Sequence, residues 1–271
     1  MAATRRTDLE VAAWGRAYRA EAAKVLSLRS TWLILLGATM FGVLVGVLTL
    51  RSTASNWTTL APADRAAFDA TADAFSGFQF AQLALGTWGV LSATGEYSAG
   101  TITSTFTAVP RRLVAFTAKL AAVTTLSIPL SIASTFAAWA IGQHVLRARG
   151  LEAHLSDPGV AAAIASAAAL LVVVTVIGLG IGAAVRHSAA AVAILVALLF
   201  LSWPAARAFE GISYLPDRWL LVNAADALVS THPITGPHAL RTPSPAAAIV
   251  VIATYLLGLL GLGSARWHTD P

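Results

Sequence analysis

The stretch Gly159–Val185 reads GVAAAIASAAALLVVVTVIGLGIGAAV and contains no acidic or basic side chain. An α-helix rises about 1.5 Å per residue, and the hydrocarbon core of a bilayer is about 30 Å thick. A helix over this stretch is longer than a bilayer requires, so we expect it to tilt or to break near Gly178, Gly180 and Gly182. The stretch predicts a helix that crosses a membrane.

The composition of the whole chain is that of a protein embedded in lipid. Hydrophobic types make up 57% of its 271 residues and charged types 11%, against roughly 25% charged in an ordinary soluble domain. The 18 Lys and Arg and 13 Asp and Glu residues are too few to cover a soluble protein of this size. A soluble enzyme, a disordered chain and a secreted disulfide scaffold are therefore excluded. The chain has no Cys, so it can form no disulfide and no cysteine-ligated metal site.

Five more stretches are apolar over about the length of a membrane span. The predicted spans are residues 32–50, 77–94, 119–143, 159–185, 188–206 and 246–265. The second is the weakest, because it contains Gln79 and Gln82. Lys119 lies at the start of the third, where its long side chain is expected to reach back to the headgroups. We therefore predict an all-α polytopic membrane protein with six transmembrane helices, in which residues 32–265 form one transmembrane domain.

Residues 1–31 are polar and rich in arginine. Apolar residues such as Leu9, Trp14 and Tyr18 recur there at about helical spacing. The pattern predicts an amphipathic helix that lies flat at the membrane surface, and a solvated helical tail is the alternative.

The distribution of basic residues predicts the orientation. If both termini are cytoplasmic, the segments on the cytoplasmic side hold 11 of the 18 Lys and Arg residues. The positive-inside rule favours this arrangement, which places residues 95–112 and the tail 266–271 inside and residues 207–245 outside. Topology and anionic lipid account for the basic charge, so no nucleic-acid partner is predicted.

The predicted spans lack the groups that would supply energy or catalysis. They contain no carboxylate, which argues against a proton- or ion-driven transporter. The glycines of Gly178–Gly182 lack the Gly-Lys-Ser/Thr ending of a phosphate-binding loop, so close helix packing explains them better, as it does Gly42 and Gly46. No metal-ligand spacing and no catalytic triad is found, so we predict neither a metal site nor a catalytic residue.

The segment 95–112 is the most distinctive part of the chain. Its residues Glu96–Arg112 read EYSAGTITSTFTAVPRR. Thr101 can cap a short helix, and Pro110 disfavours its continuation. The segment is either a short stiff element held at both ends by membrane spans or a plain connecting loop.

The order and placement of three motifs resemble those of ABC-2-type transporter permeases, in particular actinobacterial members. The first motif is an acidic residue, a Gly-Thr pair and a Pro-Arg pair between the second and third spans. The second is the amphipathic approach to the first span, and the third is a glycine-rich end of the fourth span. The matching positions are Glu96, Gly100-Thr101 and Pro110-Arg111; Ala20–Trp32; and Gly178–Gly182 with Arg186.

This resemblance implies a permease subunit of an ATP-driven exporter in the bacterial cell membrane, without catalytic activity of its own. ATP and Mg²⁺ would bind a separate ABC ATP-binding subunit, and a second permease copy or a paralogue would complete the assembly. Segment 95–112 would be the coupling helix, with coupling residues Glu96, Tyr97, Gly100, Thr101, Ile102, Thr105, Pro110 and Arg111. The helix beside it would contribute Glu21, Lys24, Arg29 and Trp32.

Three expectations remain open at this point. Glu96 is expected to pair with a basic group on the ATPase or within the helix bundle, or to be a solvated carboxylate. The outer segment 207–245 is expected to contain a short amphipathic helix from Asp217 to Val229, with Trp219, Leu220 and Leu221 as a possible exit gate or part of a membrane-resting loop. The substrate is expected to be amphipathic or apolar because the spans offer little charge, and the alternative function is a membrane anchor or signal-relay subunit without transport.

Overall fold

The computed structural model describes residues 2–27, 29–101, 107, 111–208 and 213–268. Every regular element in these ranges is helical, which confirms the all-α prediction for the described part of the chain. The elements are α1 (Ala2–Ser27), α2 (Arg29–Ser55), α3 (Pro62–Ala67), η1 (Asp73–Phe75), α4 (Phe78–Ser98), α6 (Arg112–Arg147), α7 (Val160–Val185), α8 (Ser188–Val196), η2 (Ala197–Leu201), α9 (Ser202–Arg207), α10 (Leu215–Arg218), α11 (Leu221–Val229), α12 (Pro237–Arg241) and α13 (Pro245–His268).

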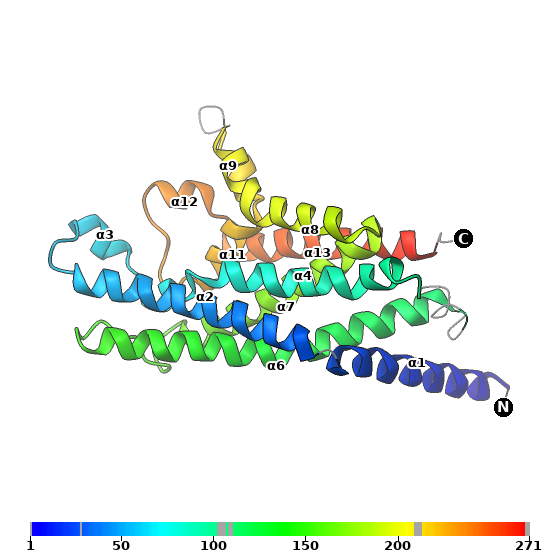
Figure 1. Cartoon of the computed structure of the whole chain (residues 1–271). Helices are drawn as coiled ribbons and strands as arrows, with labels where there is room; N and C mark the ends of the chain where they lie inside the picture. Colours follow the sequence, from blue (N-terminus) through cyan, green and yellow to red (C-terminus); the bar gives the residue numbers. More distant parts are fainter. Residues whose placement is uncertain (1, 28, 102–106, 108–110, 209–212, 269–271) are drawn as a thin grey trace.

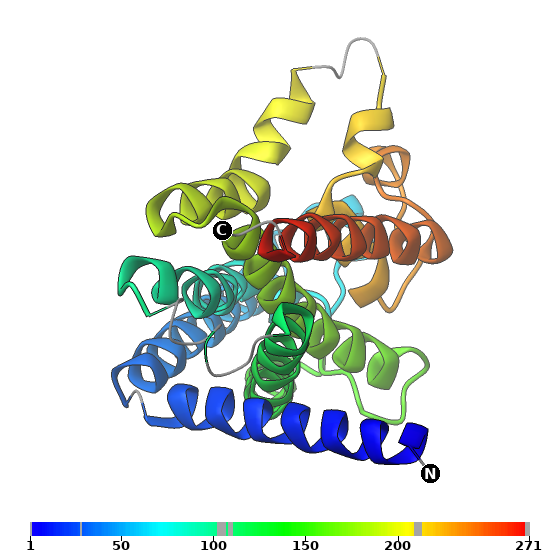
Figure 2. The same ribbon diagram turned by 90° about the vertical axis from the view of Figure 1, so that its right-hand side faces the viewer.

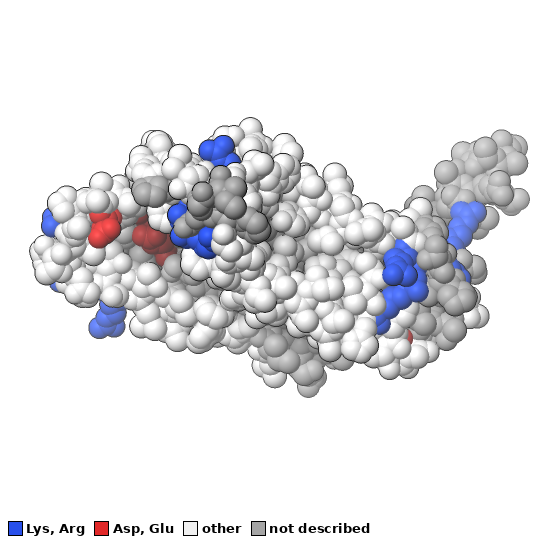
Figure 3. Space-filling view, turned by 90° about the horizontal axis from the view of Figure 1, so that it is seen from above, with Lys and Arg blue, Asp and Glu red and all other residues white. Residues whose placement is uncertain are grey.

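Five helical stretches are long and apolar enough to cross a membrane, and they coincide with five of the six predicted spans. They are Leu35–Ser55 of α2, all of α6, all of α7, Ser188–Arg207 and Pro245–Trp267 of α13. Figure 3 shows the charged side chains of one face near the two ends of the elongated molecule, with an uncharged surface between them. This distribution is the one that a bilayer requires.

The second predicted span corresponds to α4, which is long enough to cross a bilayer but is not among the five apolar stretches. The helix packs against α2 on one side and α7 on the other (Figure 1). About half of its residues are buried within the protein. Because protein rather than lipid surrounds most of its surface, α4 tolerates Gln79 and Gln82, which lower its hydropathy.

Helix α7 is the central helix of the bundle and is continuous, so the expected break at its glycines is wrong. The glycines instead let α4 and α13 approach α7 closely, as the packing explanation predicts. A Cβ atom at Gly178 would lie 2.0 Å from the carbonyl oxygen of Gly86, and one at Gly180 would lie 2.9 Å from the backbone of Leu259. Gly42 and Gly46 of α2 likewise meet backbone of the same chain, at Gly77 and Ala74.

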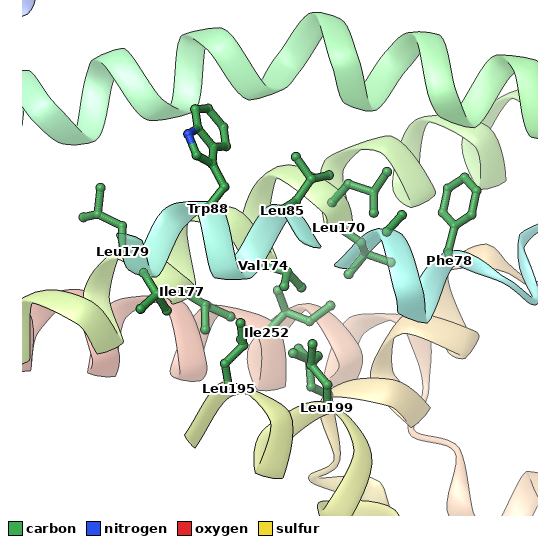
Figure 4. Close-up of a cluster of buried hydrophobic side chains, with 14 of the residues drawn as sticks. Phe78, Leu85, Trp88, Leu170, Val174, Ile177, Leu179, Leu195, Leu199 and Ile252 are labelled. Atoms are coloured by element: carbon green, nitrogen blue, oxygen red, sulfur yellow. The ribbon is translucent and has the colours of Figure 1, made fainter. Parts of the chain in front are cut away.

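The largest hydrophobic cluster fills the space around α7. Leu85 of α4, Ile177 of α7 and Leu195 of α8 are completely buried there, and Figure 4 labels all three in the cluster. Because lipid tails are as apolar as these side chains, close van der Waals packing rather than removal from water stabilises the cluster. The cluster includes residues of α2, α4, α6, α7, α8 and α13 and so joins these helices into one bundle.

The predicted span 188–206 is not one regular helix. It consists of α8, the π-helical turn η2 and α9, and α9 turns away from the bundle in Figure 1. Pro204 explains the irregularity, because it has no N–H and its ring clashes with the preceding turn. In the π register the missing donor leaves the carbonyl of Leu199 without its helical partner, and the side chain of Gln79 in α4 donates to that carbonyl at 2.7 Å.

The end of α4, the start of α6, helix α1 and the end of α13 lie at one end of the bundle (Figure 1). Figure 2 shows α1 running across the foot of the bundle, where it packs against α6. Helix α13 extends to His268 and so includes the first residues of the predicted tail 266–271. Among them, Trp267 is completely buried against Tyr97 and Phe116. At the opposite end lie α3, η1, α11 and α12.

Candidate functional site

Four charged side chains from three helices form a buried ionic cluster at the α1 end of the bundle. Glu21 and Lys24 come from α1, Glu96 from the last turn of α4, and Lys119 from the second turn of α6. The Nζ atom of Lys119 lies 2.5 Å from Glu21 Oε2 and 2.9 Å from Glu96 Oε1. The Nζ atom of Lys24 lies 2.7 Å from Glu21 Oε1 and 2.8 Å from Glu96 Oε1. Each ammonium group therefore contacts both carboxylates.

The cluster corrects the expectation for Lys119. Its side chain is only 4% exposed and does not reach toward headgroups. The physical reason is local neutrality, because two carboxylates and two ammonium groups offset one another and make the burial of each charge tolerable. Glu96 pairs within the helix bundle, which was one of the three alternatives for this residue.

Helical spacing places the two α1 members of the cluster. Glu21 and Lys24 are three residues apart and so lie on one face of α1, which packs on α6. Trp14, on the same helix, stacks on Tyr18 and donates from Nε1 to Thr117 Oγ1 of α6 at 3.2 Å. The contacts of Glu21 and Trp14 thus hold α1 against the first turns of α6.

Lys24 is the most exposed member of the cluster, with about half of its side chain accessible. Partial burial alone would lower the pKa of its ammonium group. Hydrogen bonds to Glu21 and Glu96, together with their negative charge, outweigh burial and raise the pKa above its usual value. Lys24 therefore stays charged throughout the physiological pH range.

A cavity of about 250 Å³ adjoins the cluster. Its lining includes all four charged side chains, and the rest of its wall comes from Val25 of α1 and from mostly apolar residues of α2, α4 and α6. Leu35, Trp88 and Val123 are among these apolar residues. Trp32 at the start of α2 contacts Trp88 with a distance of 6.4 Å between ring centroids.

The residues of the predicted coupling segment that the structure describes form the end of α4 and the start of α6. Gly100 has a positive φ of 67°, and the N–H of Thr101 donates to the carbonyl of Glu96 at 3.0 Å. This is the Schellman arrangement that ends a helix, and it explains why glycine occupies position 100. Arg111 precedes the first residue of α6 in an extended conformation.

Tyr97 lies on the side of α4 that faces α13. Its ring meets Trp267 edge to face at 6.0 Å, and the guanidinium of Arg186 lies 5.7 Å from its centroid. Ile102, Thr105 and Pro110 of the predicted segment, and the side chain of Arg29, lie outside the described residues.

The three predicted gate residues are placed differently from one another. Trp219 is 48% exposed, and its carbonyl accepts a hydrogen bond from the Tyr255 hydroxyl of α13 at 3.1 Å. Leu220 and Leu221 are buried. The predicted helix over 217–229 is present in two pieces, α10 and α11.

Sequence reasoning missed the role of Lys119 and so missed the cluster. A usable signal was present, because Glu96 lies two residues after one predicted span and Lys119 begins the next, which brings opposite charges to a similar depth. Two more charges at helical spacing in α1 complete the set. Among the described residues, no group of three His, Asp or Glu side chains is placed to hold a metal ion.

Comparison with protein-family models and with curated proteins finds no match to this chain. The fold itself defines the class of protein. The chain has five helices long and apolar enough to span a bilayer, and these helices pack into one bundle. It is a multi-pass helical membrane protein.

Proposed function

We propose that this chain is the membrane-spanning permease subunit of an ATP-driven exporter of the ABC-2 type, located in a bacterial cytoplasmic membrane. Both termini are cytoplasmic, α4 provides a sixth span, and α1 lies along the inner membrane surface. ATP and Mg²⁺ bind a separate ABC ATP-binding subunit, and a second permease copy or a paralogue completes the transporter. The substrate is amphipathic, and no nucleic acid takes part.

The ionic cluster is the observation that carries this proposal. A coupling element must pass a displacement from a soluble partner into the helices of the bundle. Along the chain, residues 95–112 join the end of α4 to the start of α6, and the cluster adds α1 to these two helices through Glu21 and Lys24. A push on the segment therefore reaches three helices at once.

The energetics of the cluster favour joint motion of the three helices. Moving one helix alone would separate Lys119 from a carboxylate in a buried setting, and loss of a buried partner costs roughly 3–5 kcal/mol. A displacement that keeps α1, α4 and α6 together avoids this loss. The ends of these helices are thus suited to act as one unit when the bundle repacks.

The direction of the helices supports the six-span arrangement. Along the chain, α2, α4, α6, α7, the α8–η2–α9 stretch and α13 follow alternating directions between the two ends of the bundle (Figure 1). An even number of crossings places α1 and the end of α13 on the same side. Arginines at that side then face the anionic inner leaflet.

The test is coexpression with any P-loop ATPase that a neighbouring gene encodes, followed by purification and reconstitution into nanodiscs. The variant Thr101→Arg places a bulky cation on an exposed residue of the coupling segment. We expect it to abolish copurification and stimulation of ATP hydrolysis. The matched control is Thr59→Arg, an exposed threonine at the opposite end of the bundle, which should leave both unchanged.

Two results would overturn the proposal. Binding and stimulation by Thr101→Arg at the level of the control would show that the segment does not couple the subunits. A neighbouring gene for a kinase or protease, with no ATPase that copurifies, would favour the alternative of a membrane anchor or signal relay.

A further inference from the structure

A second cavity, of about 480 Å³, lies at the end of the bundle opposite the ionic cluster. Its walls come from η1 and the loop before it, the first turns of α4, the middle of α7, and α11 with the segment that follows it. Helix α4 runs from this cavity to the ionic cluster, and its 21 residues are about 30 Å long at 1.5 Å per residue. The volume is typical of a site for a small organic molecule.

The lining of this cavity combines apolar walls with negative charge. Apolar side chains include Phe75, Phe78 and Leu170. Four serine and threonine residues also line the cavity, and no Lys or Arg is among the described lining residues. The remaining polar groups are three carboxylates, two histidines and two glutamines. These polar residues are Asp69, Asp73, Asp226, His232, His238, Gln79 and Gln82.

Asp69 is committed to holding the cavity together. Its Oδ1 accepts from the backbone N–H groups of Thr71 and Ala72 at 3.0 and 2.9 Å. Its Oδ2 accepts from the N–H and the hydroxyl of Thr231 at 2.6 and 2.9 Å. The residue fastens the loop before η1 to the segment after α11, and its acceptor sites are occupied.

Asp73 and Asp226 also line the cavity: Asp73 is half-buried and accepts a backbone hydrogen bond from Asp69, and Asp226 is exposed. The structure describes no hydrogen bond or ion pair to the Asp226 carboxylate among residues 2–27, 29–101, 107, 111–208 and 213–268. Burial, and next the negative charge of Asp69, raise the pKa of Asp73 to about 6. A positive charge in the cavity would relieve the repulsion between Asp69 and Asp73.

We propose that this cavity binds a lipophilic organic cation, whose charge faces Asp73 and Asp226 and whose apolar groups pack on Phe75, Phe78 and Leu170. A diffuse organic cation fits the lining better than a metal ion, because no three ligating side chains of the described residues converge. The binding step rests on the cavity alone. Its assignment as the exported substrate rests on the proposed function.

The experiment measures binding of tetraphenylphosphonium to the full chain in nanodiscs at pH 7.5 by equilibrium dialysis. Tetraphenylborate, which has the same shape and the opposite charge, is the matched ligand control. We expect saturable binding of the cation and none of the anion. We also expect Asp226→Asn and Asp73→Asn each to weaken cation binding about tenfold, as loss of one close charge in a partly water-excluded site predicts.

The matched control variant is Asp64→Asn, which removes an exposed carboxylate of α3 at the same end of the molecule. It should bind the cation as the unmodified chain does. Gel filtration and melting temperature confirm that each variant is folded, and should Asp73→Asn unfold, Asp226→Asn decides the question. Equal binding of the two probes, or cation binding unchanged in a folded Asp226→Asn variant, would refute the site.

The results separate this site from the proposed function. Cation binding without coupling to an ATPase keeps the site and removes the exporter. Coupling to an ATPase without cation binding keeps the permease and removes this substrate class.

Discussion

Replacing Lys119 by Met tests whether the ionic cluster is a structural junction. The variant keeps most of the side-chain volume and removes from Glu21 and Glu96 the more buried of the two ammonium groups in the cluster. Loss of one partner from a buried ion pair costs roughly 3–5 kcal/mol. At about 2 °C per kcal/mol for a domain of 150–250 residues, the melting temperature should fall by at least about 6 °C.

The assay is thermal unfolding of the purified chain in detergent, followed by tryptophan fluorescence. Lys24→Met is the matched control, since it removes the same chemical group from the same cluster at a position that is about half exposed. Solvent screening limits its expected effect to about 1 kcal/mol. The difference between the two lysines measures burial rather than charge.

A double variant tests whether the effect of Lys119→Met comes from the charge balance of the cluster. Adding Glu96→Gln to Lys119→Met restores neutrality, because Glu21 and Lys24 remain as one pair. The double variant should therefore be more stable than the sum of the two single effects predicts, by about 1.5 kcal/mol or more. A melting temperature unchanged by Lys119→Met, or strictly additive effects, would refute the view of Lys119 as a buried partner.

Three further predictions concern packing, backbone satisfaction and pH. Gly89→Ala should destabilise the bundle by more than about 2 kcal/mol, because the new Cβ would lie 2.0 Å from a backbone carbonyl oxygen of α7. Gly258 has open space around it, so the control Gly258→Ala should leave the melting temperature unchanged or raise it slightly. Gln79→Leu should cost about 1–3 kcal/mol of unfolding free energy, because it leaves a carbonyl of η2 without a hydrogen bond. Adding Pro204→Ala to Gln79→Leu restores the missing N–H donor and should recover much of that loss. Equal melting temperatures for Gln79→Leu and the double variant would contradict this. Burial alone would raise the pKa of Asp69, but hydrogen bonds from backbone N–H groups and from a hydroxyl outweigh burial and lower it. The difference in unfolding free energy between the unmodified chain and Asp69→Asn should therefore be full above about pH 4 and should shrink as the pH falls through the folded-state pKa. A difference that persists at lower pH would show that Asp69 acts by its shape alone.

Local pattern predicted most of the helices. The five apolar stretches were evident from composition over a window of about 20 residues, and the ends of α2, α7 and α13 lie close to the predicted boundaries. The amphipathic pattern over 217–229 likewise predicted α11. Each of these features depends on neighbouring residues, which the sequence contains directly.

Features that depend on distant partners were not predictable in the same way. Whether Lys119 extends to water or pairs inside the bundle depends on α1, which is about 100 residues away in the chain. Pro204 causes the bend at η2, but the bent helix is stable only because Gln79 of α4 donates a hydrogen bond to the carbonyl that the bend leaves without a partner. The same glutamine made the second span look weak, although the residue satisfies a carbonyl of another helix.

The candidate site was predicted in part. Glu21, Lys24 and Glu96 were named from a motif, and the structure brings them together with Lys119. The Gly100-Thr101 pair has a local explanation as the cap of α4, which accounts for its residue types without a partner protein. The second cavity was not foreseen, because its lining is drawn from three separate stretches of the chain, 66–82, 167–170 and 222–242.

The position of the cluster along the chain sets an order of assembly during synthesis. A chain made from its N-terminus releases Glu21 and Lys24 from the ribosome long before Glu96 and Lys119 exist to receive them. Until the start of α6 has emerged, α1 lacks Lys119 as a partner and cannot complete the cluster. The docking of α1 through the cluster is thus a late step of synthesis, because it can be completed only after α2, α4 and the start of α6 have been made.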